Sequence, residues 1–263
     1  LVMDTLGGVD TRAGYVSMDA DGFTINVDYY PDSSARIVSY MAIGGLEAAK
    51  IVNFTSKTST GTYDVTDVGF RPDCLIFAGA TQQALGSTSN SLYLNLGFCD
   101  SDLNQFSRSV FSWDSQAVAD TSELISDTYA ITQSNVPSQL FTKEKVISFL
   151  FNGFRMQNDA SNGAAHHFFA IAMKGVDVRA GYTDAPTTAS TKEVAAPFEF
   201  EGMFTLCGTD GSTFDTVTAH NRFGAGFAAG TNAVDQVVAC CLDIQGEDPT
   251  NTFRYMATGA VWN

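Results

Sequence analysis

A stretch near the amino terminus returns in altered form about 130 residues later, and this internal repeat constrains the fold more than any other feature. Residues Asp21 to Lys50 read DGFTINVDYYPDSSARIVSYMAIGGLEAAK, and residues Asn152 to Gly175 read NGFRMQNDASNGAAHHFFAIAMKG. Each copy has an alternating apolar run that opens with Gly-Phe, then a polar loop, then a second apolar run that ends in Gly. The pattern predicts a pair of strands with a flexible connection, made twice.

Six anchor positions recur in the same order at a nearly constant spacing of about 130 residues. The pairs are Phe23/Phe154, Ala42/Ala172, Phe54/Tyr182, Phe70/Phe200, Gly97/Gly224 and Asp114/Asp243. Such spacing indicates one ancestral unit with small insertions and deletions in its loops. Two periods nearly fill the 263 residues, so the chain holds two units' worth of sequence.

Many short apolar segments, separated by Gly, Asn, Asp and Ser turns at roughly ten-residue spacing, predict an all-β protein. No long amphipathic helical pattern is present. Cys74 to Ala78 is a continuous apolar run, which is typical of a strand buried on both faces. Mixed signals over Ala117 to Ser134 predict a short strand or a single helical turn, and Arg179 to Thr183 is expected to repeat an earlier strand.

The composition excludes several classes of partner. The 29 acidic residues outnumber the 14 Lys and Arg residues, so the net charge is −15, and nucleic acids and anionic membrane surfaces are poor partners. No apolar run is long enough to span a bilayer. The amino terminus lacks the basic and apolar regions of a signal peptide and begins in the middle of a pattern, so we expect processing or an incomplete chain.

The sequence contains no catalytic, cofactor-binding or metal-binding signature. Residues Arg12 to Asp28 read as one strand with a turn at Asp19 to Gly22. This turn resembles the start of a calcium loop, but its second copy lacks both acids, which favours a polar turn. His166 and His167 are adjacent, so on a strand they face opposite ways. The five cysteines show no CxxC spacing and are expected to be buried free thiols.

The aromatic residues supply the candidate contact surface. Tyr29 and Tyr30 precede a proline in a loop, and Trp113 stands beside Asp114, so these side chains do not fit an inner face. An exposed aromatic ring next to a carboxylate can hold a sugar by stacking and hydrogen bonds, whereas a subunit interface uses the same residue types. The polar loop that begins with Gln82 and Gln83 is a further candidate for contacts.

Four successive motifs carry a resemblance to a known family. They are YVSMDADGFTIN from Tyr15, ARIVSYMAIGG from Ala35, KIVNF from Lys50 and VGFRPD from Val68. In this order they resemble the tandem β-sandwich repeats of uncharacterised proteins that are encoded in the virion gene clusters of tailed phages and prophages. The resemblance is close over residues 15–78 and weaker over residues 145–245, and its motifs are turn glycines and core aromatics.

The resemblance implies two tandem jelly-roll-like antiparallel β-sandwiches related by internal duplication. In its phase, residues 50–175 form a complete sandwich, and residues 1–49 pair with residues 176–263 to close a second one from the two chain ends. This closure is expected because half a sandwich would leave open edges and bare apolar faces. The alternative phase divides the chain into residues 1–131 and 132–263.

The implied function is that of a phage virion structural protein, a capsid decoration or a tail or fibre component. Such a protein acts through contacts with other virion proteins, as a homo-oligomer or multi-copy assembly, and is located in the virion after assembly in the host cytoplasm. We expect no enzyme activity, no cofactor and no metal. The alternative function is a glycan-binding module for attachment to the host surface, and a glycan-cleaving enzyme is the more distant one.

Overall fold

The structure of the protein, a computed structural model, consists of strands and their connections in the residues that it describes. These are residues 2–3, 9–29, 42–82, 84–87, 91–113, 117–135, 139–185, 188, 190–208, 213–230, 235–248 and 252–258. None of them belongs to a helix, so no helix there is long and apolar enough to cross a membrane. Every strand pairing is antiparallel. The predicted all-β class with antiparallel sheets is confirmed.

The chain divides into two compact units, Leu1–Ala42 with Gly86–Asn90, and Ile43–Leu85 with Ser91–Asn263. The first unit contains the first sheet, of order β1-β2-β3, with β1 at Val2–Met3, β2 at Val9–Asp19 and β3 at Gly22–Tyr29. Strands β2 and β3 pair across the turn at Asp19 to Gly22, where the sequence predicted one strand with a turn, and the second apolar run of this copy lies mostly outside the described residues. The Asp19 carboxylate accepts hydrogen bonds from the hydroxyls of Ser17 and Thr24 beside the turn, at 2.8 and 2.7 Å.

The described residues of the second unit form three sheets. The β12 sheet has the order β10-β11-β12-β5, the seven-stranded sheet has the order β15-β9-β8-β7-β6-β13-β4, and the fourth sheet has the order β14-β16-β17-β18. The bounds are β4 Ala48–Thr55, β5 Gly61–Val65, β6 Cys74–Gln82, β7 Leu92–Cys99, β8 Gln105–Ser112, β9 Thr121–Ser126, β10 Ile131–Asn135, β11 Gln139–Leu150, β12 Gly153–Ala160, β13 His167–Lys174, β14 Gly202–Cys207, β15 Thr218–Ala219, β16 Asn221–Ala229, β17 Asp235–Asp243 and β18 Thr252–Thr258.

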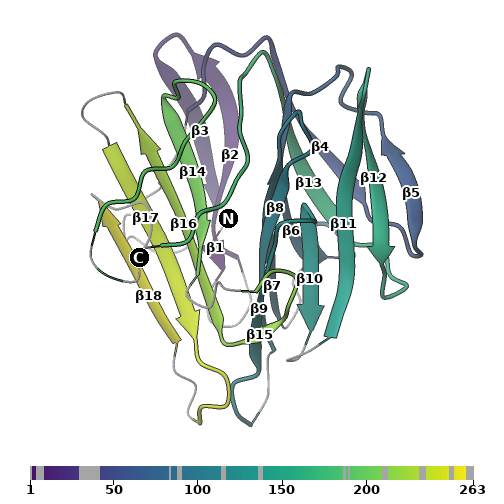
Figure 1. The fold of residues 1–263 in the computed structure, drawn as a ribbon, viewed down its shortest axis with the longest axis vertical. Helices are drawn as coiled ribbons and strands as arrows, with labels where there is room; N and C mark the ends of the chain where they lie inside the picture. The colour runs from purple at the N-terminus through teal and green to yellow at the C-terminus, as the bar shows by residue number, and fades with distance from the viewer. Residues whose placement is uncertain are drawn as a thin grey trace. The chain divides into compact units, whose positions relative to one another are not determined.

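The apolar core of the second unit lies between the β12 sheet and the seven-stranded sheet, which face each other as a sandwich (Figure 1). The ring of Phe154 on β12 meets Phe54 on β4 and Phe77 on β6 edge-on, with centroids 5.7 and 5.8 Å apart. This is a favoured geometry for aromatic pairs. The buried residues of this cluster run from Val52 to Ala172. The domain boundaries predicted from the sequence, at residues 50 and 175 or at residue 131, stay a prediction.

The pairing of the first sheet recurs in the β12 sheet 131 positions later. Met18 is opposite Phe23 as Phe149 is opposite Phe154, and all nine partner pairs of β1, β2 and β3 return in β10, β11 and β12. The register shifts also return, from Val2/Met3, Arg12/Ala13 and Tyr15/Ser17 to Gln133/Ser134, Lys143/Glu144 and Val146/Ser148. Because a bulge inserts an unpaired residue and fixes the register around it, the two sheets have the same backbone plan.

Four expectations from the sequence need correction. The two apolar runs of Asn152 to Gly175 do not pair with each other, because β12 lies between β11 and β5 in one sheet and β13 lies between β6 and β4 in another. The segment from Ala117 to Ser134 contains β9 and most of β10, rather than one short strand or a helical turn. The segment Arg179 to Thr183 forms no strand, because the Ala180 amide donates to the Asp100 carboxylate instead of to a neighbouring strand. The five cysteines are free, but only Cys74 and Cys99 are buried, and the other three are half-buried.

Gly97 on β7 gives a direct test of the sandwich packing. A Cβ atom at this position would lie 1.9 Å from the carbonyl oxygen of Ala130, which precedes β10. We expect Gly97→Ala to lower the free energy of unfolding by about 3 kcal/mol in urea titration, because the backbone must move. The control Gly14→Ala, where an added Cβ meets nothing within 4 Å, should change it by less than about 0.5 kcal/mol. Equal effects of the two substitutions would contradict the close approach of Gly97 and Ala130.

Candidate functional site

The contact residues predicted from the sequence come from several elements, and Tyr29, which was expected in a loop, belongs to a strand. Tyr29 ends β3, Gln82 ends β6, and Trp113 follows β8 directly. Tyr29 and Trp113 are 45% and 46% exposed, so both rings are half open to solvent, and the Trp113 ring also meets Phe111 at 5.9 Å. Tyr30, Gln83 and Asp114 lie outside the described residues, as does the side chain of Gln82.

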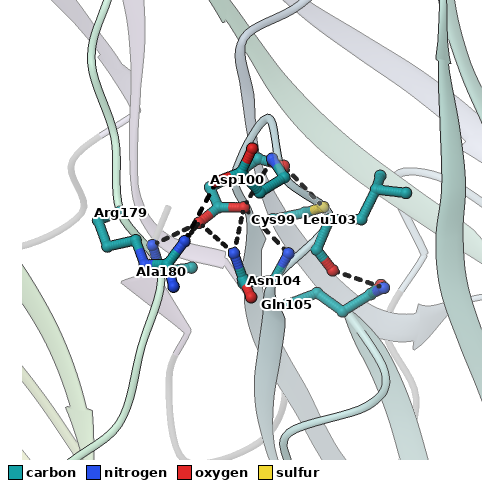
Figure 2. A network of polar contacts seen from close by, with 8 residues as sticks. Cys99, Asp100, Leu103, Asn104, Gln105, Arg179 and Ala180 are labelled. Carbon is teal, nitrogen blue, oxygen red and sulfur yellow. Dashed lines mark hydrogen bonds and ion pairs between the residues drawn. The ribbon is translucent and has the colours of Figure 1, made fainter. Parts of the chain in front are cut away.

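Asp100, in the turn between β7 and β8, is the centre of a buried polar network (Figure 2). Its side chain is 1% exposed, and its oxygens accept hydrogen bonds of 3.0 Å from the amides of Asp102 and Asn104 and from the Asn104 side chain. The Ala180 amide donates to the same carboxylate at 3.0 Å, and the Arg179 guanidinium lies 3.7 Å away. Asp100 therefore attaches a segment that has no strand to the end of the seven-stranded sheet.

The same turn, Asp100-Ser-Asp-Leu-Asn, has oxygen-bearing side chains at alternate positions, as a cation loop does. In the structure the Asp100 oxygens are occupied by N–H donors, and Leu103 takes the left-handed backbone at φ 67° that closes the turn. No group of three or more His, Cys, Asp or Glu side chains among the described residues could hold a metal ion. The hydrogen bonds of this network stabilise the turn.

A buried ion pair within the seven-stranded sheet also makes hydrogen bonds to the fourth sheet. Arg108 on β8 and Glu123 on β9 are 2.5 Å apart, and each side chain is 3% exposed. The Arg108 guanidinium also donates to the Arg222 carbonyl oxygen on β16, and the Arg222 amide donates to Glu123 at 3.0 Å. Because each charge has partners from both sheets, loss of one would leave the other buried without this opposite charge.

Glu144 on β11 is a fully buried acid on the inner face of the sandwich. The Tyr63 hydroxyl donates to its Oε2 atom, but its Oε1 atom has no hydrogen-bond partner among the described residues. Asn158 is directly opposite Glu144 in the β11–β12 pairing, and its Oδ1 atom also has no partner there. A protonated Glu144 would supply a hydroxyl donor beside this acceptor.

Burial raises the pKa of Glu144 to about 7, against the opposing effect of the Tyr63 hydrogen bond. The neighbouring Lys143 and Lys145 lie over the ring of Tyr129, and Lys145 pairs with Asp159 at 2.8 Å, so these charges are engaged elsewhere. The fold therefore favours the neutral acid at this position.

An apolar row crosses the outer face of the seven-stranded sheet, on the side away from the β12 sheet. Ile51, Ile171, Ile76, Phe98 and Phe106 follow one another across β4, β13, β6, β7 and β8 as directly opposite residues. One end is covered, because Phe98 meets Phe204 at 6.4 Å and Phe106 meets Tyr182 at 5.8 Å. The other end is open.

The open end of this row is the candidate contact surface, which we call the β4–β13 patch. It consists of Ile51, Phe169 and Ile171, and Ile51 is 65% exposed. Strand β4 is also the last strand of its sheet, with β13 as its one partner among the described strands. An exposed apolar surface beside an unpaired strand edge is a frequent feature of protein–protein contact sites.

Some of these buried and exposed residues could have been inferred from the sequence. Alternation in Lys143-Glu144-Lys145-Val146 places Glu144 on the face of Val146, so its burial could have been inferred. Arg108 and Glu123 lie on short strands with ordinary alternation, and no local pattern shows that a further sheet covers them. From the sequence alone, Ile51 and Ile171 would be taken for core residues, because the sequence does not show which part of an outer face is covered.

Comparison with known proteins found no match to this chain among family models, curated proteins or solved structures.

The Asp100 network gives the second testable prediction. Asp100→Ala leaves four N–H donors without their acceptor, so we expect the free energy of unfolding to fall by about 3 kcal/mol or more. Hydrogen exchange of the Ala180 amide should become faster in parallel. The matched control Asp102→Ala removes an exposed carboxylate 3.3 Å from Arg179 and should change stability by less than about 0.5 kcal/mol. An unchanged Ala180 exchange rate would show that Asp100 does not fasten this segment.

Glu144 gives the third prediction, which concerns pH. Because its pKa is raised in the folded protein, the unfolded chain loses this proton first as the pH rises from about 4.5, and stability falls until the folded group ionises near pH 7. We expect wild type to lose about 3 kcal/mol relative to Glu144→Gln between pH 4 and pH 8, measured by urea titration at each pH. A difference between the two proteins that does not vary with pH would show that Glu144 is not held in its neutral form.

Proposed function

We propose that this chain is a non-enzymatic structural protein of a tailed-phage virion, a capsid decoration or a tail or fibre component. It acts through protein–protein contacts, as one of many copies, and reaches the virion by assembly in the host cytoplasm. The observation that carries the proposal is the β4–β13 patch, in which Ile51, Phe169 and Ile171 are exposed beside an edge strand that has one partner among the described strands. A neighbouring virion protein or a second copy would bury this surface.

The finer description of the fold belongs to the same proposal. We propose two jelly-roll-like sandwiches that arose by internal duplication, with residues 50–175 as the complete one. The support comes from the first sheet and the β12 sheet, whose nine equivalent partner pairs and three equivalent register shifts are all displaced by 131 positions. Two unrelated three-stranded sheets have no reason to share bulge positions, since bulges occur at many places in sheets.

The acidic charge fits a multi-copy assembly. With a net charge of −15, free copies repel one another over the screening distance in solution, about 8 Å at physiological salt. Association then requires a specific apolar contact or a neighbour of opposite charge. The β4–β13 patch offers the apolar contact.

The second candidate function is a glycan-binding module for the host surface, and the half-exposed ring of Trp113 favours it. Tyr29 offers a similar ring on a different strand. Glycan-array binding that is lost in Trp113→Ala or Tyr29→Ala would support this candidate over the first. Ordered copies on particles, with no affinity for glycans, would exclude it.

The fourth prediction tests the patch on phage particles. In a phage that lacks the native gene and is complemented with variants, we expect the double variant Ile51→Ser, Ile171→Ser to reduce the number of copies per purified particle by at least about tenfold. The reason is the loss of two apolar side chains whose burial contributes about 3 kcal/mol in total. Quantitative immunoblotting of particles measures the copy number.

The control is Phe151→Ser, because Phe151 is 83% exposed at the β11–β12 turn and lies outside the patch. It should leave the copy number unchanged. Particles that contain no copies of the wild-type protein would contradict the virion proposal itself. Particles that take up the double variant at the wild-type level would show that the contact lies elsewhere.

A further inference from the structure

The loop between β12 and β13 contains an Asn-Gly pair whose side-chain amide contacts two hydrogen-bond donors. The Ala164 amide donates to the Asn162 Oδ1 atom at 3.0 Å, and the His166 Nε2 atom lies 3.2 Å from the same oxygen. A backbone N–H can only donate, so the contacted atom is the carbonyl oxygen of the Asn162 amide, and the His166 nitrogen donates to it as well. The two donors together polarise this carbonyl group.

The His166 ring is held in place by contacts that do not involve Asn162. The side chain is 3% exposed, and the His166 amide donates to the Ser56 Oγ atom at 3.0 Å. The Ser56 amide donates in return to the His166 carbonyl oxygen at 2.9 Å. Because these bonds fix the backbone at the start of β13, the ring stays in position while the Asn162 side chain changes.

The Gly163 nitrogen is the neighbouring nucleophile for the polarised carbonyl group. Asn162 and Gly163 are both exposed, and Gly163 has no Cβ atom to hinder an approach to the side chain before it. The Gly163 N–H donates to the Ser161 Oγ atom at 3.1 Å, and that hydroxyl donates to the Lys57 carbonyl oxygen at 3.2 Å. This chain of hydrogen bonds orients the Gly163 peptide and gives its proton an acceptor.

The sequence contains one other Asn-Gly pair, Asn152-Gly153, and its surroundings are different. Gly153 is buried at the start of β12, where an added Cβ atom would lie 1.9 Å from the Val65 carbonyl oxygen. The Asn152 carbonyl oxygen accepts a hydrogen bond of 3.0 Å from the Gly69 amide. An attack by the Gly153 nitrogen would require this packed turn to open first, so the pair is an internal reference for the exposed one.

We propose that Asn162 is a self-modification site, at which the folded loop promotes conversion of the side-chain amide into a carboxylate. The Gly163 nitrogen forms a bond to the Asn162 Cγ atom, its proton passes through solvent to Nδ2, and the Cγ–Nδ2 bond breaks as ammonia leaves. Water then opens the resulting five-membered succinimide ring and yields aspartate or isoaspartate. Ala164 and His166 stabilise the negative charge that develops on Oδ1 during the attack.

The product differs from the original chain in charge. It carries one negative charge more than the −15 of the unmodified sequence. In the aspartate product, the His166 Nε2 donor meets a carboxylate in place of an amide, and a charged acceptor makes the stronger hydrogen bond. The modification therefore strengthens the contact between this loop and β13. It needs no enzyme and is independent of the proposed virion role.

The fifth prediction compares the two Asn-Gly pairs in the purified full chain at neutral pH. Peptide mapping by mass spectrometry measures the conversion of each amide into an acid over time. In the folded protein we expect Asn162 to convert at least about tenfold faster than Asn152, because only Asn162 combines an accessible nucleophile with donors on its carbonyl oxygen. In concentrated urea the two pairs should convert at similar rates, and Asn162 should convert no faster there than in the folded protein.

A pair of matched variants tests the donor. His166→Phe removes the ring nitrogen and should slow the conversion of Asn162 at least about fivefold. The control His167→Phe changes the adjacent ring, whose Nδ1 atom lies 3.0 Å from the Asn53 Oδ1 atom, and should leave the rate unchanged. The rate at Asn152 reports in each variant whether the turn stays folded, since unfolding would raise it to the rate in urea.

Equal conversion of Asn162 and Asn152 in the folded protein would overturn the proposal. Faster conversion of Asn162 in urea than in the folded protein would overturn it too, because the loop would then protect the amide. An unchanged Asn162 rate in His166→Phe, with Asn152 still slow, would remove His166 from the site. If Asn152 is fast in His166→Phe, the variant is unfolded, and the comparison of folded and urea-treated wild type decides the question.

Discussion

The edge-on packing of Phe154 between Phe54 and Phe77 is the contact on which the sandwich of the second unit depends. It joins the β12 sheet to the seven-stranded sheet, and the apolar cluster from Val52 to Ala172 surrounds it. Two glycines permit this closeness. Gly97 lets the chain at Ala130 approach β7, and Gly79 leaves room for the ring of Phe168. Interiors of this density tolerate little added volume, so these small residues are part of the packing.

Polar groups inside the second unit have two different roles. Asp100, Arg108 and Glu123 have partners from more than one segment, so they fix how the segment at Ala180 and the fourth sheet attach to the seven-stranded sheet. Glu144 has an incomplete set of partners, and the fold responds by favouring its neutral form. In both cases burial makes the number and type of partners decisive.

The first sheet and the β12 sheet show that register and side-chain chemistry can vary separately. Ala13 and Val27 occupy the positions of Glu144 and Asn158, yet the partner pairs and bulges are equivalent. The turn and the bulges fix the register, whereas the inward side chains depend on what covers them. The apolar pair in the first sheet and the polar pair in the β12 sheet therefore differ without any change of register.

The sequence by itself determined the strand class, because alternation and turn residues are local signals, and it placed the turn at Asp19 to Gly22. The duplication that its repeat of about 130 residues predicts stays a proposal. The sequence did not determine that Ala117 to Ser134 makes two strands or that Arg179 to Thr183 makes none. It also did not determine that, on one outer face, Arg108 is buried and Ile51 is exposed. Arg108 is buried and Ile51 is exposed because the fourth sheet reaches β8 and β9 and leaves β4 open. Only the tertiary structure decides which faces are covered, since that depends on segments more than a hundred residues away.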